Sequence, residues 1–136
     1  MEIQDYNKRI IDEFRANAGK VGGQFANTPL LLLTTVGAKS GQARINPLAY
    51  FMDGDRYLII ASYAGAATNP PWYFNLVANA KVEVEVGSER FSAMAQVLVE
   101  PERTEQYAKI AAASAAFAEY ARKTTRAIPV IALSRV

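Results

Sequence analysis

The spacing of hydrophobic residues changes along the chain and predicts one helix followed by a series of strands. Between residues 2 and 18 the apolar side chains recur every three or four positions, which is the spacing of an amphipathic helix. They are Ile3, Tyr6, Ile10 and Phe14. Glycines at positions 19, 22 and 23 predict the end of this helix and a flexible connection. We expect the helix to pack on its own domain, although the pattern also suits a membrane surface or a partner.

Three apolar runs in the first half of the chain predict strands. Residues 30–35 begin with four leucines, as expected for a short strand that is buried on both faces. Residues 45–52 predict a second strand, in which Pro47 indicates an edge position or a bulge. An Asp-Gly-Asp sequence at residues 53–55 leads into a third strand at residues 56–62. The two aspartates could also bind a metal, but Asp-Gly between two strands is typical of a hairpin turn.

The second half of the chain continues with a short helix and a hairpin. Asn69 and the two prolines after it can start a helix that runs to about residue 79. Residues 81–86 alternate between valine and charged residues, which predicts a strand with one solvent-exposed face. The glycine-serine pair at residues 87–88 predicts a tight turn into a returning strand at residues 89–99.

The C-terminal region predicts a long helix and a last strand. Pro101 can begin a helix whose spacing continues through Ser114 to Ala121, and residues 128–133 suit an edge strand. Six strands joined mostly by hairpins, with three helices, favour a mainly β fold: an antiparallel barrel or strongly curved sheet with flanking helices. The length of 136 residues suits one domain. We therefore divide the chain into an N-terminal helix, residues 1–20, and a single domain, residues 21–136.

The composition restricts the chemistry that this chain can perform. It contains no histidine and no cysteine, so it lacks a Ser-His-Asp triad, a thiolate nucleophile and the common zinc ligands, and we expect no metal site. A formal charge of +2 is too balanced for a nucleic-acid-binding protein. If the protein is an enzyme, carboxylates, lysine or tyrosine transfer the protons, or an organic cofactor supplies the reactive atom.

The N-terminal residues bear on the location of the protein. They are charged and lack the apolar core of a signal peptide, so we expect a cytoplasmic protein. No apolar run approaches the ~20 residues that span a bilayer, and no transmembrane segment is expected. Peripheral contact with the inner face of the cell membrane is compatible with the amphipathic helix.

The turn between the first two predicted strands is a candidate anion site. Gly37 and Gly41 flank it, so its backbone can present N–H groups to a ligand. Lys39 adds a positive charge, and Arg44 adds a planar guanidinium group suited to phosphate or carboxylate. The same residues also suit an ordinary hairpin turn.

The start of the helix at residues 69–79 offers a second place for an anionic or carbonyl oxygen, because helix N-termini present unpaired N–H groups. Three aromatic residues follow one another there, Trp72, Tyr73 and Phe74. A helix cannot bury all three on one face, so at least one should face a cleft or another element.

Four segments of the chain, in this order, resemble those of a known family. They are TTVGAKSGQARINPLAYF, DGDRYLIIAS, NPPWYFNLVAN followed by KVEVEVG, and TTRAIPVIALSR. Together they resemble the deazaflavin-dependent nitroreductases, also described as coenzyme F420-dependent quinone reductases, over about residues 21–136. The resemblance implies a split β-barrel similar to that of FMN-binding flavoproteins. It also implies that reduced F420, an 8-hydroxy-5-deazaflavin, passes a hydride to a quinone, an enone or a nitro compound.

The resemblance further implies roles for individual residues. Lys39, Ser40 and Arg44 would hold the phosphate and the acidic lactyl-oligoglutamate tail of the coenzyme. Tyr120 and Ser62 are the implied catalytic residues, because they would orient the oxygen of the acceptor. The residues implied to bind the coenzyme are Ala38, Lys39, Ser40, Arg44, Asn46, Pro47, Leu48, Ala61, Ser62, Tyr63, Trp72, Tyr73 and Asn75.

The chain also departs from the family pattern. Ala38 and Tyr63 stand where the family usually has a basic residue, and Ser114 and Phe117 replace hydroxyphenyl side chains of the nitroimidazole pocket. Weak reduction of nitroimidazoles is therefore expected. The alternatives to an F420-dependent reductase are an FMN-binding oxidoreductase on the same barrel, a deazaflavin carrier without turnover, and an interaction module that uses the aromatic residues. A homodimer is a further expectation, with the strand at residues 81–86 as a candidate surface.

Overall fold

The structure is a computed structural model and describes residues 3–25 and 28–136. Its centre is a seven-stranded antiparallel sheet in the order β2-β1-β5-β6-β7-β4-β3. The strands are β1 (Leu30–Val36), β2 (Ala43–Ala49), β3 (Phe51–Asp53), β4 (Arg56–Ile60), β5 (Lys81–Val86), β6 (Glu89–Val97) and β7 (Val130–Arg135). The helices are α1 (Ile3–Ala16), α2 (Pro71–Ala78), α3 (Glu102–Ala113) and α4 (Ala115–Lys123), with short 3-10 turns η1 (Gly23–Phe25) and η2 (Tyr63–Gly65).

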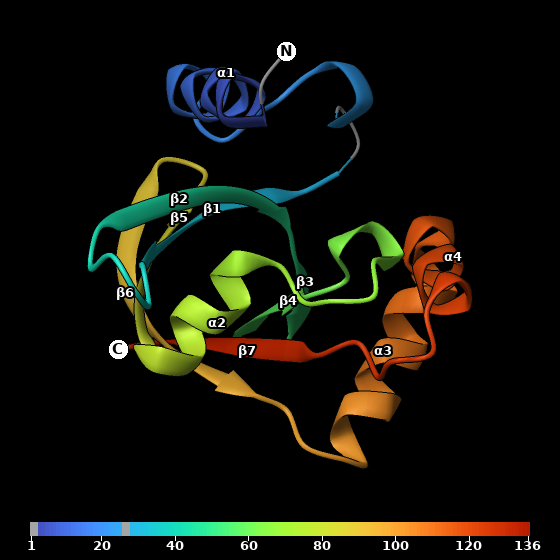
Figure 1. The fold of residues 1–136 in the computed structure, drawn as a ribbon. Helices are drawn as coiled ribbons and strands as arrows, with labels where there is room; N and C mark the ends of the chain where they lie inside the picture. Colours follow the sequence, from blue (N-terminus) through green and yellow to red (C-terminus); the bar gives the residue numbers. More distant parts are fainter. Residues whose placement is uncertain (1–2, 26–27) are drawn as a thin grey trace.

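The first and last strands in the sheet order, β2 and β3, are consecutive in the sequence. β2 and β3 are separated only by Tyr50, yet β2 pairs with β1 and β3 pairs with β4. The sheet therefore curls into a barrel with α2 in its mouth (Figure 1). This confirms the predicted mainly β fold with flanking helices. The strand predicted at residues 45–52 became two because the chain changes partners at Tyr50, and Pro47 does lie on a strand at one end of the sheet order.

Successive side chains of β1 point to opposite faces of the sheet, so α2 can pack on one face and α1 on the other. Leu31 and Leu33 are fully buried inside the barrel, where α2 also packs. Leu30 and Leu32 face the other way and pack against α1 through residues that include Phe14. Each such leucine stabilises the fold by roughly 1.5–3 kcal/mol through burial. The N-terminal helix thus packs on its own sheet, as predicted; residue 2, where its prediction began, lies outside the described residues.

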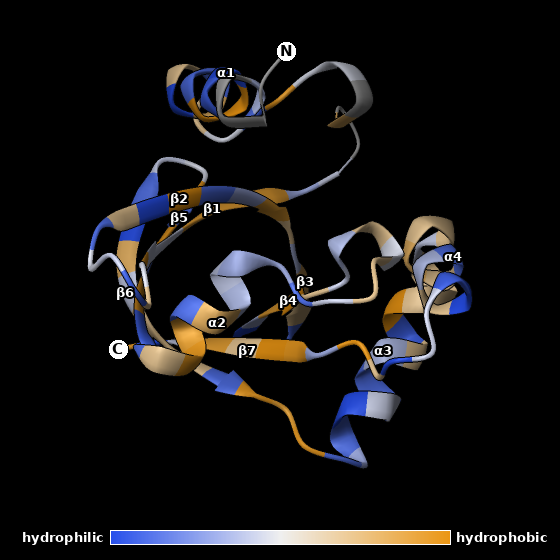
Figure 2. Ribbon diagram, viewed as in Figure 1, coloured by the Kyte–Doolittle hydropathy of each residue, from blue (hydrophilic) through white to orange (hydrophobic). Residues whose placement is uncertain are grey.

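The last strand was wrongly predicted to lie at an edge. β7 pairs with β6 on one side and β4 on the other, and Val130, Ile131, Ala132 and Leu133 have no exposed surface. Ile131 and Leu133 point into the barrel, while the other two pack under α3 and α4, so both faces of β7 are hydrophobic (Figure 2). β5 is likewise an interior strand between β1 and β6, so it offers no free backbone edge for dimer formation.

The single late helix of the prediction is in fact two helices. Ser114 has an extended backbone, with φ −138° and ψ 113°, and separates α3 from α4. Serine competes for backbone hydrogen bonds and therefore interrupts helices more readily than the alanines around it. The break lets Phe117 and Tyr120 of α4 pack beside the cluster that α3 forms with β4 and β7. Among the described residues, no helix has the length and apolar character needed to cross a membrane.

Candidate functional site

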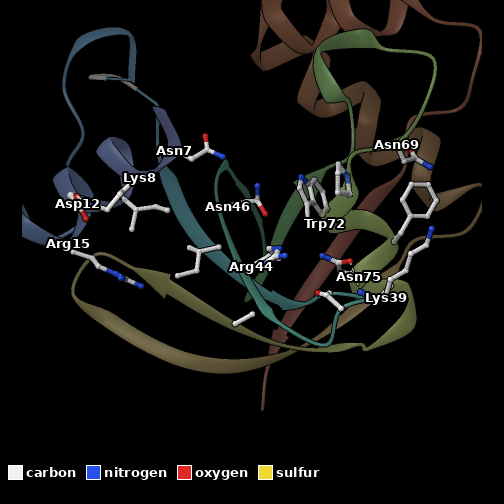
Figure 3. A pocket seen from close by; sticks show the side chains of 18 residues that line it. Asn7, Lys8, Asp12, Arg15, Lys39, Arg44, Asn46, Asn69, Trp72 and Asn75 are labelled. Atoms are coloured by element: carbon white, nitrogen blue, oxygen red, sulfur yellow. Dashed lines mark hydrogen bonds and ion pairs between the residues drawn. The ribbon is translucent and has the colours of Figure 1, made fainter. Parts of the chain in front are cut away.

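A large pocket lies between α1, the β1–β2 turn and the start of α2. Its volume is about 1110 Å³. Figure 3 shows Arg44 near its centre, with Lys39 and Asn75 on one side and residues of α1 on the other. The lining residues are Asn7, Lys8, Ile11, Asp12, Arg15, Gly37, Ala38, Lys39, Ser40, Ala43, Arg44, Ile45, Asn46, Asn69, Pro71, Trp72, Phe74 and Asn75. We call this space the main pocket.

A second, smaller pocket of about 250 Å³ lies between β2, the end of β4 and α4. Its lining is Pro47, Leu48, Ala49, Ile60, Ser62, Tyr63, Ala64, Pro70, Trp72, Phe117 and Tyr120. Trp72 lines both pockets and is 5% exposed, so its buried ring stands at their boundary. We call this space the side pocket.

Most of the predicted site residues line these two pockets. Those at the main pocket are Ala38, Lys39, Ser40, Arg44, Asn46, Trp72 and Asn75. Those at the side pocket are Pro47, Leu48, Ser62, Tyr63, Trp72 and Tyr120. Two predicted residues line neither pocket: Ala61 is fully buried in the barrel core, and Tyr73 packs against that core. Of the three aromatic residues in a row, Trp72 and Phe74 face the main pocket, as the prediction required of at least one.

The backbone of the β1–β2 turn has fewer free donors than the sequence indicated. Four of its N–H groups already donate within the protein, namely those of Gly37, Ala38, Gly41 and Gln42. Those of Lys39 and Ser40 have no partner among the described residues. A phosphate or carboxylate would therefore depend mainly on side-chain cations here rather than on a backbone nest.

Two such cations are available. Within the described ranges, Lys39 makes no ion pair, and the guanidinium group of Arg44 donates only to the Gln42 side chain, at 3.2 Å. Both side chains are exposed at the rim of the main pocket. Positive charges without a carboxylate partner favour an anionic ligand, and arginine can bind phosphate or carboxylate with two hydrogen bonds.

Asn75 connects α2 to the turn. Its Oδ1 accepts a hydrogen bond from the N–H of Ala38 at 3.0 Å, and its Nδ2 donates to Oγ1 of Thr35 at 3.1 Å. Both Asn75 and Thr35 are buried. Asn75 therefore positions the turn that carries Lys39, and its amide is already hydrogen-bonded within the protein.

Replacing Asn75 with alanine should lower the free energy of unfolding by about 1–2 kcal/mol, because the buried hydroxyl of Thr35 and the N–H of Ala38 lose their partner. Affinity for an anionic ligand of the main pocket should fall as well, because the turn is no longer held. Urea unfolding and ligand titration measure the two effects. The control is Asn79→Ala at the exposed end of α2, which should change neither; equal behaviour of both variants would contradict the role of Asn75.

The side pocket combines apolar walls with two hydroxyl groups. The hydroxyl of Tyr120 has no hydrogen-bond partner among the described residues, and its ring packs edge-to-face on Phe117 at 5.5 Å. Ser62 is 7% exposed and also lines this pocket. Burial raises the pKa of the nearby Tyr107, whose hydroxyl donates to the carbonyl of Phe117 at 2.6 Å. Tyr107 thus holds α4 in place, while Tyr120 is available to a ligand.

The backbone next to Ser62 is strained. Tyr63 and Ala64 have positive φ values of 48° and 55°, and Gly65 follows with 82°. The left-handed conformation costs a residue with a Cβ roughly 1–2 kcal/mol. Gly65 is required for a second reason, since a Cβ there would lie 2.9 Å from Cβ of Lys123 on α4. Strain of this kind persists only where the surrounding structure holds it, and it often marks functional sites.

Arg126 holds this strained segment, and the sequence analysis did not assign it a role. Its guanidinium group donates to the carbonyl groups of Ala61, Ser62 and Ala66 at 3.0, 2.9 and 2.9 Å, and to Oδ1 of Asn69 at 2.6 Å. Burial lowers its pKa below the usual arginine value. We call this set of contacts the Arg126 clamp. The sequence signal was an arginine with no acidic neighbour just before an apolar strand.

Comparison with known proteins gives a consistent picture. Residues 7–135 match the model of a family described as F420H(2)-dependent quinone reductase. A Mycobacterium tuberculosis (strain H37Rv) protein named F420H(2)-dependent quinone reductase is 38% identical over 126 residues, which are 90% of this chain and 85% of that protein. A second protein of the same strain, named as a putative member, is 37% identical over 77% of this chain and 88% of its own length.

Solved structures agree. One titled as an F420-H2 dependent reductase (FDR-A) has a TM-score of 0.70 and 37% identity, covering 78% of this chain and 94% of its own. One titled as a domain-swapped dimer has a TM-score of 0.72 and 32% identity, covering 97% and 96%. A putative pyridoxamine 5'-phosphate oxidase from Listeria innocua, at 12% identity and a TM-score of 0.55 over 98% of this chain and 94% of its own, shows likeness of fold alone. The chain belongs to the F420H(2)-dependent quinone reductases, a family of oxidoreductases with a split-barrel fold whose cofactor is coenzyme F420.

Proposed function

We propose that this protein transfers a hydride from reduced F420 to a quinone. One observation carries the proposal: the main pocket holds two cations, Lys39 and Arg44, and the apolar side pocket holds the hydroxyl of Tyr120, with Trp72 lining both pockets. Among the described residues, neither cation has a carboxylate partner and this hydroxyl has no hydrogen-bond partner. The names of the relatives in Mycobacterium tuberculosis and the solved F420-H2 dependent reductase support it. The absence of histidine and cysteine also favours a reaction in which a cofactor supplies the reactive atom.

The two pockets suit the two parts of the coenzyme. F420 joins a planar deazaflavin to an acidic tail with a phosphate and carboxylates, and when bound it supplies a hydride. Lys39 and Arg44 would hold the acidic part, while Pro47, Leu48 and Trp72 would contact the planar part. The main pocket, at about 1110 Å³, is slightly larger than most sites for small organic ligands, which reach about 1000 Å³.

The chain's own residues position the reactants and keep water out. The hydroxyl of Tyr120 donates a hydrogen bond to the oxygen of the acceptor, where negative charge develops, and Ser62 offers a second donor. Ile60 and Phe117 give the side pocket apolar walls that exclude water. Reactants held about 3–3.5 Å apart react as if in one molecule, so positioning supplies much of the catalysis. Solvent water supplies the last proton, since no histidine is present.

The acceptor class follows from the side pocket. A quinone presents a flat ring and a carbonyl oxygen, which suit the ring of Phe117 and the hydroxyl of Tyr120. Nitro compounds present similar features, and we propose that they are accepted more slowly, because Phe117 adds no second hydroxyl and Ser114 lines neither pocket. Turnover of matched quinone and nitroaromatic acceptors measures this preference.

Anaerobic titration and turnover test the proposal. Oxidised F420 and FMN are titrated separately into the purified protein, and oxidation of reduced F420 is followed with and without a quinone. The proposal requires tight binding of F420, weaker binding of FMN, and quinone-dependent oxidation. Binding without turnover would identify a carrier, stronger binding of FMN would identify an FMN oxidoreductase, and binding of neither would favour an interaction module.

Replacing Tyr120 with phenylalanine should lower kcat for quinone reduction by about tenfold, because the donor to the acceptor oxygen is lost. The Kd of F420 should change little, since the ring of Tyr120 stays in place. Stopped-flow reduction and coenzyme titration separate the two quantities. The matched control is Tyr57→Phe, which removes a hydroxyl that lines neither pocket; the same loss of kcat in both variants would contradict the role of Tyr120.

A homodimer is a second proposal about partners. It is supported by the structure titled as a domain-swapped dimer, which covers 97% of this chain at 32% identity. Light scattering during size-exclusion chromatography tests it, and a monomeric mass across the accessible concentration range would contradict it.

A further inference from the structure

The polar side of α1 forms one wall of the main pocket. Ile10 and Phe14 of this helix are buried against the sheet. A second row of α1 side chains, spaced one helical turn from one another, lines the pocket. These residues are Asn7, Lys8, Ile11, Asp12 and Arg15. Spacings of three and four residues place such side chains on one face of a helix. The helix therefore uses one face for folding and presents the other to whatever occupies the pocket.

The two cations in this row, Arg15 and Lys8, make ion pairs of different strength. Arg15 makes a two-pronged ion pair with Glu85 of β5 at 3.0 and 2.8 Å, so its charge is neutralised and it fixes α1 to the sheet. Lys8 pairs with Asp12, at 3.7 Å, its one ion pair with a side chain that the structure describes, and both side chains are mostly exposed. Exposed pairs of this kind contribute about 0–1 kcal/mol, so an incoming anion can replace Asp12 at little cost.

Three cations consequently follow one another across the pocket. Figure 3 shows Lys39 on one side, Arg44 near the middle, and Lys8 beyond it on α1. The first two lie on the turn and strand that the proposed function assigns to the acidic part of the coenzyme. Lys8 lies on the wall formed by α1, so a ligand held at Lys39 and Arg44 would have to extend toward α1 to contact it. A chain of several carboxylates has this shape and charge.

We propose that Lys8 binds the distal carboxylates of the coenzyme's oligoglutamate tail, so that α1 makes affinity depend on tail length. This inference rests on the proposed binding of F420 and adds a specificity residue outside the turn. Asp12 acts in the opposite direction, because its carboxylate competes for Lys8 and repels the tail. Arg15 has a structural role, because its ion pair with Glu85 attaches α1 to the sheet.

The experiment compares two preparations of oxidised coenzyme, one with a single glutamate and one with a long glutamate chain. Both are titrated into the wild-type protein, Lys8→Gln and Asp12→Asn. The charge-matched control is Lys81→Gln, which replaces an exposed lysine at the start of β5. Lys8→Gln should weaken binding of the long-tail form by roughly three- to tenfold and leave the short-tail form nearly unchanged. Asp12→Asn should strengthen binding of the long-tail form. The long-tail advantage of the wild type should shrink as salt is raised.

The outcomes separate this inference from the proposed function. Equal affinity of the wild type for both preparations, or the same loss in Lys8→Gln and Lys81→Gln, would overturn the role of Lys8 while leaving F420 binding intact. Equal loss for both preparations in Lys8→Gln would place Lys8 near the phosphate and overturn tail-length dependence. Failure of the wild type to bind either preparation would overturn the proposed function and this inference with it.

Discussion

Replacing Arg126 with methionine should lower the free energy of unfolding by about 2–4 kcal/mol. The methionine keeps an apolar stem of similar length but leaves three carbonyl groups and Oδ1 of Asn69 without their donor. Each hydrogen bond to a charged group contributes about 1.5–3 kcal/mol, and water can compensate part of the loss because the site is half-buried. The unfavourable conformations of Tyr63 and Ala64 would also lose the contacts that hold them.

The same substitution should impair both pockets. The Arg126 clamp connects Ser62, which lines the side pocket, to Asn69, which lines the main pocket. We expect the Kd of F420 to rise and kcat to fall together, because both walls of the site lose their relative position. Arg126→Lys should recover only part of the stability, since an ammonium group cannot reach four acceptors in different directions.

Urea unfolding, coenzyme titration and quinone turnover measure these effects. The control is Arg122→Met on α4. Within the part of the chain that the structure describes, its guanidinium group pairs only with the exposed Glu119 and should contribute less than about 1 kcal/mol. Equal stability of the Arg126 and Arg122 variants would show that the clamp is unimportant. A large loss of stability with unchanged kcat and Kd in the remaining folded protein would show that it serves the fold alone.

The fold was largely predictable because most of its elements carry a local period. The alternating valines of β5 define that strand to its last residue, and the four leucines of β1 correctly indicated burial on both faces. The errors arose where long-range packing decides. β7 resembles an edge strand in isolation and becomes an interior strand only because β4 and β6 lie on either side of it. The chain also changes partners at Tyr50, which no local pattern marks.

The site was predictable to a different degree. Most of the residues that the resemblance assigned to the site line one of the two pockets, whereas Ala61 and Tyr73 line neither. The resemblance did not separate residues that face a ligand from residues that position others. Asn75 holds the turn through Ala38 and Thr35, and Arg126 holds the segment after β4. Their partners are distant in sequence, so only the folded chain identifies these roles. The contribution of α1 to the main pocket was missed for the same reason.

Lys39→Ala should weaken binding of F420 by about ten- to a hundredfold. Lys39 has no ion pair to lose among the described residues, so the substitution removes charge from the ligand site without breaking an internal contact. One charge-assisted hydrogen bond contributes about 1.5–3 kcal/mol, and 1.4 kcal/mol corresponds to tenfold in affinity. The stability of the variant should stay near that of the wild type, because the side chain is exposed.

Arg44→Ala should give a similar loss, and the double variant should lose less than the product of the two, because both cations act on one anionic ligand. Fluorescence titration measures each Kd, and Lys109→Ala on the exposed side of α3 serves as the control. Increasing salt should weaken F420 binding by the wild type more than binding by either variant. Each variant has lost one ionic contact with the ligand, so salt has fewer such contacts to screen. If Lys39→Ala and Lys109→Ala bind F420 as tightly as the wild type, the acidic tail does not lie at the β1–β2 turn, and the proposed placement of the coenzyme in the main pocket is wrong.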